Sequence, residues 1–202
     1  MNTPIVDTNR DWYSYYNAVA NRPPRKTTLT ALGSFPQSGM AIDLGCGDGR
    51  DTVPILNQNW QVLAIDRERE AINRLLSRTD CEKQLLTTKI ASFEDLQLPS
   101  DIDLINASFC LPFCSSHAFP QLWQKITASL KVDGRFAGHF FGDRDSWCDR
   151  TYMNCLTKQQ VKNLFTNYEI ELWEEEEHFG KTPLEEDRYW HIFHVVARKN
   201  RF

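Results

Sequence analysis

The 202-residue sequence lacks several features that would each point to a particular class of protein. None of its six cysteines forms a C-x-x-C pair, the spacing typical of zinc-binding and redox-active cysteines. No uninterrupted apolar stretch approaches the ~18 residues that a membrane span needs. Residues 1–10 lack the basic start and the apolar segment of a secretory signal. We therefore expect a soluble cytoplasmic protein, in which cysteines are most often small buried hydrophobes.

An excess of positive charge is also missing. The chain has 23 lysines and arginines against 27 aspartates and glutamates, and no basic stripe follows an expected helix. Nothing therefore predicts a nucleic-acid partner. Cys110, Cys114 and His117 could be imagined as a zinc site, but their spacing is not diagnostic, and we expect no metal. No repeat, low-complexity segment or linker divides the chain, which predicts one domain over residues 1–202.

Hydrophobic periodicity predicts alternating strands and helices from residue 40 onward. The expected strands cover residues 40–44, 61–66, 85–90, 102–108 and 134–142. The expected helices cover residues 9–20, 25–32, 50–59, 67–78 and 117–130, and another begins at the capping-box sequence 157–160. The third strand is more polar than the others, so we expect it near an edge of the sheet.

The end of the chain breaks this alternation. Segments 168–177 and 191–198 both have the composition of strands, and the loop between them has no room for a crossover helix. They should therefore pair antiparallel, because parallel neighbours need a long crossover connection. Five strand–helix units followed by an antiparallel hairpin predict an α/β fold with seven strands.

The most informative segment is 40–51, an apolar run that carries Asp43 and ends in Gly45, Gly47 and Gly49. Glycine allows a sharp turn and lets a ligand approach the backbone closely. The next strand-like run ends at Asp66, whose carboxylate could accept hydrogen bonds from the two hydroxyls of a ribose. Together these features predict a nucleoside site at the carboxyl edge of the sheet. The plainer alternative is a simple strand–helix turn with Asp66 as a helix cap.

The order of the glycines argues against a nicotinamide-dinucleotide cofactor. A nicotinamide-dinucleotide site favours G-x-G-x-x-G, whereas here Arg50 and Asp51 follow the last of three alternating glycines. The sequence 103–113 likewise lacks the Asn-Pro-Pro-Tyr signature of enzymes that methylate amino nitrogens. A dinucleotide-dependent oxidoreductase and amino-directed DNA modification are both disfavoured.

The glycine turn, Asp66 and the antiparallel ending resemble the class I S-adenosylmethionine (SAM) dependent methyltransferases. The turn 45–52 is similar to that of bacterial tellurite-resistance-type and thiopurine-type enzymes, and residues 189–199 resemble the closing strand of other SAM-dependent members. The resemblance implies a Rossmann-like seven-stranded sheet with helices on both faces and the last strand antiparallel. It implies SAM as cofactor, S-adenosylhomocysteine (SAH) as product, and methyl transfer to an oxygen, nitrogen, sulfur or metalloid centre of a small molecule. A non-catalytic SAM-binding module is the alternative.

The resemblance also implies roles for individual residues. Asp43 would hold the α-ammonium group, Arg25 or Arg50 the methionine carboxylate, and segment 91–96 would wrap the adenine. Within the domain, residues 1–33 would form a lid, 40–142 the SAM-binding core, and 143–202 the substrate side. The expected cofactor-binding residues are Trp12, Arg25, Asp43, Gly45, Cys46, Gly47, Gly49, Arg50, Asp66, Arg67, Ser92, Phe93, Glu94, Asn106, Ala107 and Ser108.

The acceptor side is expected around Phe109, Asp143, Arg144 and Trp147, and no residue is assigned as a catalytic base. Phe109, with Leu111 and Phe113, would form an apolar collar near the sulfonium, or else ordinary core. The acidic stretches 174–177 and 185–187 would form a solvated strand face, or else a pocket for a cationic acceptor. His139 lies within a strand, where a hydrogen-bonded core histidine is the simplest interpretation.

Overall fold

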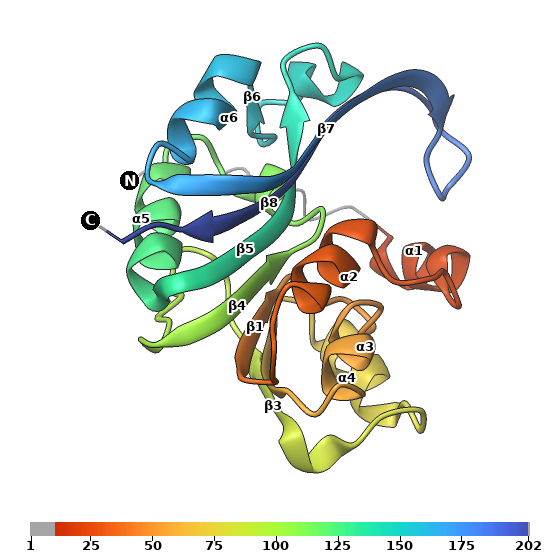
Figure 1. Cartoon of the computed structure of the whole chain (residues 1–202). Helices are drawn as coiled ribbons and strands as arrows, with labels where there is room; N and C mark the ends of the chain where they lie inside the picture. The colour runs from red at the N-terminus through yellow and green to blue at the C-terminus, as the bar shows by residue number, and fades with distance from the viewer. Residues whose placement is uncertain (1–10, 202) are drawn as a thin grey trace.

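The structure is a computed structural model that describes residues 11–201 (Figure 1). Residues 1–10 and 202, including the first two residues of the helix expected over 9–20, lie outside the described residues. The α-helices are α1 (Trp12–Val19), α2 (Lys26–Gly33), α3 (Thr52–Leu56), α4 (Arg69–Ser77), α5 (Phe119–Ser129) and α6 (Lys158–Leu164). The 3-10 helices are η1 (Lys83–Leu85), η2 (Leu111–Phe113) and η3 (Ser146–Asp149). The strands are β1 (Met40–Leu44), β2 (Gln61–Asp66), β3 (Leu86–Ile90), β4 (Ile102–Ala107), β5 (Leu130–Gly142), β6 (Cys155–Leu156), β7 (Tyr168–Lys181) and β8 (Asp187–Lys199).

The strands form one sheet in the order β3-β2-β1-β4-β5-β8-β7, and the short β6 pairs with the end of β5. Strands β1 to β5 pair in parallel, whereas β8 is antiparallel to both β5 and β7. The expected α/β fold with an antiparallel last strand is confirmed, as is the edge position of β3. The strand order reverses between β1 and β4, and ligands of such sheets bind at the carboxyl edge beside that reversal.

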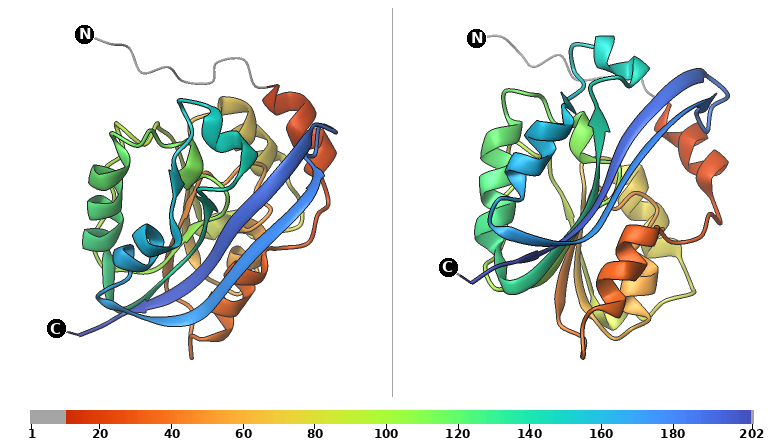
Figure 2. Two further views of the ribbon diagram at one scale, coloured as in Figure 1. Left: turned by 90° about the horizontal axis from the view of Figure 1, so that it is seen from above. Right: turned by 45° about the horizontal axis from the view of Figure 1, so that its top comes forward.

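Helices cover both faces of the sheet (Figures 1 and 2). On one face α5 and α6 bury an aromatic core with the sheet, in which Trp123 and Phe165 pack on Phe136 and Phe140. On the other face α2, α3 and α4 bury a mainly aliphatic core around Trp60. Among the described residues, no helix combines the length and apolar character needed to cross a membrane. Two cores thus fix the sheet from both sides and leave its carboxyl edge open.

The hairpin of β7 and β8 is longer than its hydrophobic pattern predicts. Both strands continue through the acidic stretch and reach past the sheet to lie beside α1 (Figures 1 and 2). The extension is possible because the glutamates are paired with cations or histidines: Glu174 with Lys26, Glu175 with Lys158 and Glu177 with Arg144. Such pairing removes the repulsion that adjacent carboxylates on neighbouring positions would otherwise cause.

Helix α3 is shorter than the helix expected over residues 50–59. Gly49 has φ +89°, so it belongs to the turn, and the helix begins only at Thr52. It ends at Leu56, and Asn59 with φ +60° reverses the chain into β2. The capping box expected at 157–160 is confirmed, since Thr157 and Gln160 exchange hydrogen bonds at the start of α6.

The expectation that the cysteines are buried hydrophobes is wrong for two of them. Cys148 and Cys155 form a disulfide. The pairing depends on β6, which bonds to the end of β5 and brings Cys155 back to η3; spacing in the sequence does not reveal it. Cys46, Cys110 and Cys114 are free and buried, as expected of cysteines that act as small hydrophobes.

Candidate functional site

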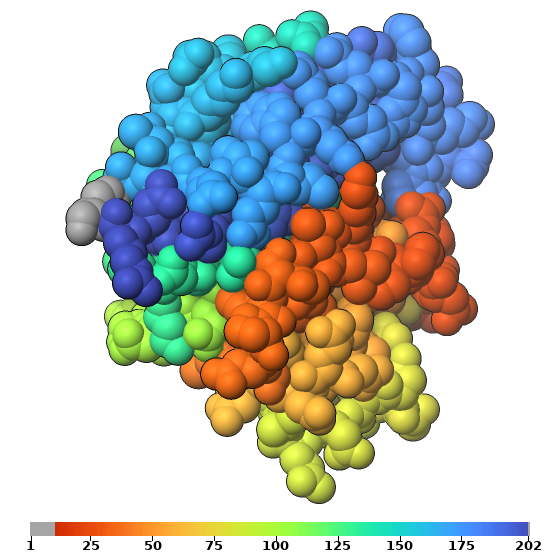
Figure 3. All heavy atoms as spheres, viewed as in Figure 1, coloured from red at the N-terminus to blue at the C-terminus, as the bar shows by residue number. Residues whose placement is uncertain are grey.

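A cavity of about 550 Å³ lies at the carboxyl edge of the sheet, the size range of small-molecule sites. We divide it into two sides. The glycine-turn side is formed by α1, the start of α2 and the loops that follow β1, β2 and β3. The hairpin side is formed by the exit of β4, the end of β5 with η3, and the β7–β8 hairpin. The surface of the α1–α2 segment meets the hairpin directly in the space-filling view (Figure 3).

The glycine turn brings backbone close to the cavity. Gly45 and Gly47 line it with φ of +61° and +56°, a region that side chains rarely adopt. A Cβ on Gly45 would come within 2.3 Å of the Cβ of Cys110, so the site needs glycine there for space as well. Gly49 does not line the cavity. It packs instead against Leu75 of α4, where a Cβ would lie 2.5 Å from Cδ1.

Asp66 ends β2 with both carboxylate oxygens engaged by backbone. It accepts one hydrogen bond from the N–H of Gly47 and another from the N–H of Glu68, each 2.9 Å long. Burial raises the pKa of Asp66 above its usual value, while these two bonds act in the opposite sense. The carboxylate is therefore fixed in place at the rim of the glycine turn, and it lines the cavity.

Asp43 is 1% exposed in β1 and is held by two side chains. Thr52 and Asn106 donate hydrogen bonds to its two oxygens. Asn106 is positioned in turn by Thr28 of α2, whose hydroxyl donates to the amide oxygen over 2.9 Å. Burial is the main cause that raises the pKa of Asp43 to about 7. A cationic ligand group beside it would compensate the charge that burial penalises.

Two arginines, Arg25 and Arg50, also line the cavity. Arg25 donates its backbone N–H to Asp51 and lies with its guanidinium 4.2 Å above the ring of Phe109. Arg50 donates through Nε to the carbonyl of Pro23, but its Nη1 is buried without a hydrogen-bond partner among the described residues. Burial lowers the pKa of both guanidinium groups, to about 10 for Arg25. An anionic group between them would satisfy the unpaired donor.

Aromatic side chains of α1 close one wall of this side. Trp12 and Tyr16 stack with ring centroids 6.0 Å apart, and both line the cavity. Segment 91–94, after β3, forms another wall, where the hydroxyl of Ser92 donates to Asp95. The expected cofactor-binding residues that line the cavity are Trp12, Arg25, Asp43, Gly45, Cys46, Gly47, Arg50, Asp66, Arg67, Ser92, Phe93, Glu94 and Ser108.

Several expected site residues lie outside the cavity lining. Gly49 packs on α4, Ala107 is buried in the core, and Asn106 is a buried support for Asp43. On the acceptor side Phe109 and Trp147 line the cavity, but Asp143 and Arg144 do not.

The register of β7 and β8 determines which side chains lie on the hairpin side, and the sequence alone does not reveal this register. Register pairs Glu176 with Ile192, His178 with Trp190, and Glu174 with His194, so these side chains share one face. Lysines, glutamates and aromatics that sequence reasoning did not assign therefore line the cavity. The unassigned lining residues from the hairpin and its surroundings are Phe141, Tyr152, Glu176, His178, Lys181, Arg188, Trp190, Ile192 and His194.

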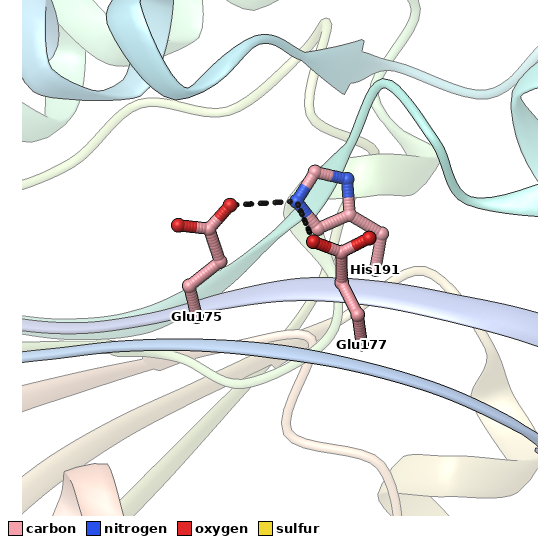
Figure 4. A group of neighbouring side chains, drawn as sticks. All are labelled: Glu175, Glu177 and His191. Atoms are coloured by element: carbon pink, nitrogen blue, oxygen red, sulfur yellow. Dashed lines mark hydrogen bonds and ion pairs between the residues drawn. The ribbon is translucent and has the colours of Figure 1, made fainter.

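The alternate residues of the hairpin form a separate cluster on the other face, shown in Figure 4. Glu175, Glu177 and His191 lie close enough to hold a metal ion. Arg144 already engages this group: it donates to both carboxylates, and its backbone N–H donates to Nδ1 of His191. With Nδ1 used as an acceptor, Nε2 carries the proton and donates to Glu175 over 3.2 Å. The guanidinium also lowers the pKa of Glu177 to about 2.

His139 differs from the hydrogen-bonded core histidine expected from the sequence. It is 1% exposed, and its Nδ1 has no hydrogen-bond partner among the described residues. Its ring instead stacks on Phe109 with centroids 4.1 Å apart, and Phe109 adopts φ +56° to reach it. Burial holds the pKa of His139 well below its usual value, so the ring is neutral. Positive φ in a bulky residue is a form of strain found at functional sites.

Comparison with known proteins gives this geometry its context. The family described as a methyltransferase domain matches residues 41–134. TehB from Haemophilus influenzae aligns with a TM-score of 0.76 at 15% identity, over 94% of this chain and 67% of that one. The N-methyltransferase NodS from Bradyrhizobium japonicum WM9, in complex with SAH, gives 0.68 at 16% identity, over 94% and 98%. A Burkholderia thailandensis 1,6-didemethyltoxoflavin-N1-methyltransferase gives 0.64 at 18%, over 95% and 82%. No curated protein matches the sequence.

The family match covers the glycine turn, Asp66 and the strands that carry them, and the fold has the antiparallel last strand typical of class I enzymes. Residues 41–134 thus match a methyltransferase domain, and the chain as a whole has the fold of class I SAM-dependent methyltransferases.

Proposed function

We propose that the protein transfers the methyl group of SAM to a small-molecule acceptor bound on the hairpin side of the same cavity. The observation that carries this proposal is the charge pattern of the glycine-turn side. The buried carboxylate of Asp43, the half-buried carboxylate of Asp66, and Arg25 and Arg50 all line the cavity, and one guanidinium donor of Arg50 is unsatisfied. Such an arrangement is complementary to an amino-acid zwitterion joined to a nucleoside.

Each charged group has a role in this proposal. Arg50, with Arg25 beside it, would hold the methionine carboxylate, and Asp43 the α-ammonium group. Asp66 would accept the ribose hydroxyls, while Ser92, Phe93 and Glu94 would surround the adenine. Trp12 and Tyr16 of α1 would cover the cofactor, so that residues 12–33 serve as a lid over the core.

SAM supplies a methyl group on a sulfonium, which is electrophilic without further activation. The protein then has to align the acceptor and exclude water. Ser108 and Phe109, at the exit of β4, stand where the two sides of the cavity meet.

A small acceptor is supported by the shape of the hairpin side. Residues of the hairpin, η3 and α1 line the cavity, whose volume of about 550 Å³ is in the range of small-molecule sites. The toxoflavin methyltransferase of similar fold was crystallised with its small heterocyclic substrate and SAH. The acidic stretch as a whole does not form a cationic-acceptor pocket, since among residues 174–177 only Glu176 lines the cavity.

Calorimetry with SAM and SAH tests the proposal. We expect both to bind, and Asp66→Ala to weaken SAH binding by at least ~10-fold, because a charged hydrogen-bond acceptor for two hydroxyls is lost. Asp80→Ala is the matched control, since Asp80 is exposed and outside the cavity. Absence of binding at tens of micromolar, or equal affinity in Asp66→Ala and wild type, would refute the assigned site. SAH binding without turnover on a broad acceptor panel would instead indicate a non-catalytic module.

A further inference from the structure

Two histidines and one glutamate form a hydrogen-bonded group on the cavity face of the hairpin. Nε2 of His194 lies 2.8 Å from Oε2 of Glu176, and Nδ1 of His178 lies 3.1 Å from Oε1 of the same carboxylate. All three residues line the cavity. Of the two histidines, His194 is the more enclosed, with 17% of its side chain exposed against 46% for His178.

The bond to Glu176 determines which nitrogen of His194 is available. A carboxylate only accepts hydrogen bonds, so Nε2 carries the proton and Nδ1 keeps its lone pair. No hydrogen bond to Nδ1 is formed within residues 11–201. An imidazole oriented by a carboxylate through one nitrogen and open at the other is the arrangement of a general base.

The surroundings of His194 keep this ring neutral. The charged and titratable groups that face it are Glu174 and Glu176 on β7, His139 on β5 and Arg25 at the start of α2. Burial is the largest influence and lowers the pKa of His194, against an opposing effect of the two glutamates. A neutral ring near pH 7 is ready to take a proton.

Beside His194 the cavity is walled by aromatic rings. Phe109 lies at the exit of β4 with its centroid 6.4 Å from the ring of His194, and Phe141, Tyr152 and Trp190 line the same side. The guanidinium of Arg188 lies 4.2 Å from the centroid of Phe141 and 3.7 Å from that of Trp190, so these rings can offer a flat guest their remaining faces and their edges.

We propose that His194, held in place by Glu176, is the general base of the reaction, and that the acceptor is a planar aromatic molecule whose hydroxyl oxygen is methylated. This inference rests on the proposed function and specifies its acceptor. A hydroxyl is the nucleophile that needs such a base, because it reacts poorly until its proton is removed. A thiolate, a free amine or a metalloid anion is already nucleophilic and would not need the Glu176–His194 pair as a base.

The proposed reaction moves one proton and one methyl group. The acceptor O–H gives its proton to Nδ1 of His194, and the resulting imidazolium is stabilised by Glu176. The electron pair of the oxygen forms a bond to the methyl carbon while the carbon–sulfur bond breaks and its electrons stay on sulfur. SAH and the methyl ether leave, and His194 releases the proton to water.

The test uses 4-nitrophenol, a planar phenol whose ionisation changes its visible absorbance, added to the full-length protein saturated with SAH. We expect bound 4-nitrophenol to ionise at a pH lower by about one unit or more in wild type than in His194→Gln, because the neutral imidazole accepts the proton. Glu176→Gln should give an intermediate shift, as expected of a positioning residue. His117→Gln, an exposed histidine outside the cavity, should match wild type.

The outcomes separate this inference from the function on which it rests. Failure of SAH to bind the wild-type protein would overturn the proposed function, and this inference with it. SAH binding without 4-nitrophenol binding, or with equal ionisation in wild type and His194→Gln, would overturn this inference alone. If His194→Gln itself loses SAH binding, Glu176→Gln decides: ionisation unchanged from wild type counts against the base.

Discussion

The two sides of the cavity are built by different means. The glycine-turn side is made by short-range structure: Asp43, the three glycines and Asp66 lie within two neighbouring strands, β1 and β2, and the turn that follows β1. The hairpin side is made by long-range pairing, since the register of β5, β7 and β8 brings alternate residues onto one face, among them His139, Glu176 and His194. The first side leaves a buried donor of Arg50 unsatisfied. On the second side the carboxylates of Asp145, Glu174 and Glu176 have partners, and His139, whose Nδ1 has none among the described residues, is stacked against Phe109.

This difference indicates a division of labour. Unsatisfied buried polar groups cost stability and persist where a ligand completes them. Fully paired groups and packed aromatics give a preformed surface that a ligand need not complete. We therefore expect substitutions on the glycine-turn side to act mainly on cofactor affinity, and substitutions on the hairpin side to act on stability or on the acceptor.

The largest effect is expected from Arg188→Met on the hairpin side. Arg188 donates two hydrogen bonds to Asp145, of 3.0 and 2.9 Å, and the two side chains are 1% and 0% exposed. Removing the cation leaves a buried carboxylate uncompensated, which should lower the free energy of unfolding by about 3–5 kcal/mol in urea denaturation. Arg201→Met, an exposed arginine, is the control. A loss below about 1 kcal/mol would show that the hairpin does not depend on this pair.

Arg50→Ala tests the glycine-turn side. The substitution removes the guanidinium proposed for the methionine carboxylate, so calorimetry should show SAH affinity reduced by ~10- to 30-fold, or roughly 1.5–2 kcal/mol. The free energy of unfolding should change little, since among residues 11–201 the side chain of Arg50 forms a hydrogen bond only to the carbonyl of Pro23. Arg78→Ala, whose main partner is Asp80 outside the cavity, serves as control. An unchanged SAH affinity combined with a large loss of stability would reverse the proposed contrast.

The sequence predicts the glycine-turn side better than the hairpin side, because the first depends on local structure and the second on long-range pairing. The glycine turn and Asp66 are recognisable because their chemistry is written in neighbouring residues. Glu176 and His194 are not, because their facing depends on the register of β7 and β8, which shifts between Ile170 and Leu172. Glu177, the neighbour of Glu176 in β7, points to the opposite face of the hairpin, where it accepts a hydrogen bond from Arg144.

The positions of two further residues, Asn106 and Cys155, depend on contacts between distant segments. Asn106 was expected beside the methionine moiety, but it lies within the buried network and connects Thr28 of α2 to Asp43. Cys155 returns to Cys148 only because β6 pairs with β5. Each depends on a tertiary contact between segments that are separate in the sequence, and no motif marks such a contact.

Asp43 predicts a pH dependence of cofactor binding. Its pKa is raised to about 7, mainly by burial, so its contribution to stability is present at low pH and is lost as the pH rises toward 7. An ammonium group beside it favours the carboxylate, so SAH affinity should weaken below pH 7, by up to about tenfold per pH unit. Calorimetry between pH 5.5 and 8 should give a steeper dependence for wild type than for Asp43→Asn. Equal slopes would place the ammonium elsewhere, since Asp66 titrates in both proteins.

The smallest effect concerns the contact that joins the two sides. Lys26 of α2 forms an ion pair with Glu174 of β7, but the side chains are 66% and 45% exposed. Water and salt screen such a pair, so Lys26→Ala should lower the free energy of unfolding by less than about 1 kcal/mol and leave SAH affinity unchanged. Denaturation in low and high salt measures it, with Lys181→Ala, a similar exposed pair within the hairpin, as control. A large loss specific to Lys26→Ala would mean that the two sides are mechanically coupled, because the lid would then depend on the hairpin for its position. A small loss means that α2 is held by Thr28 and the buried network around Asp43, so that each side can change in evolution without disturbing the other.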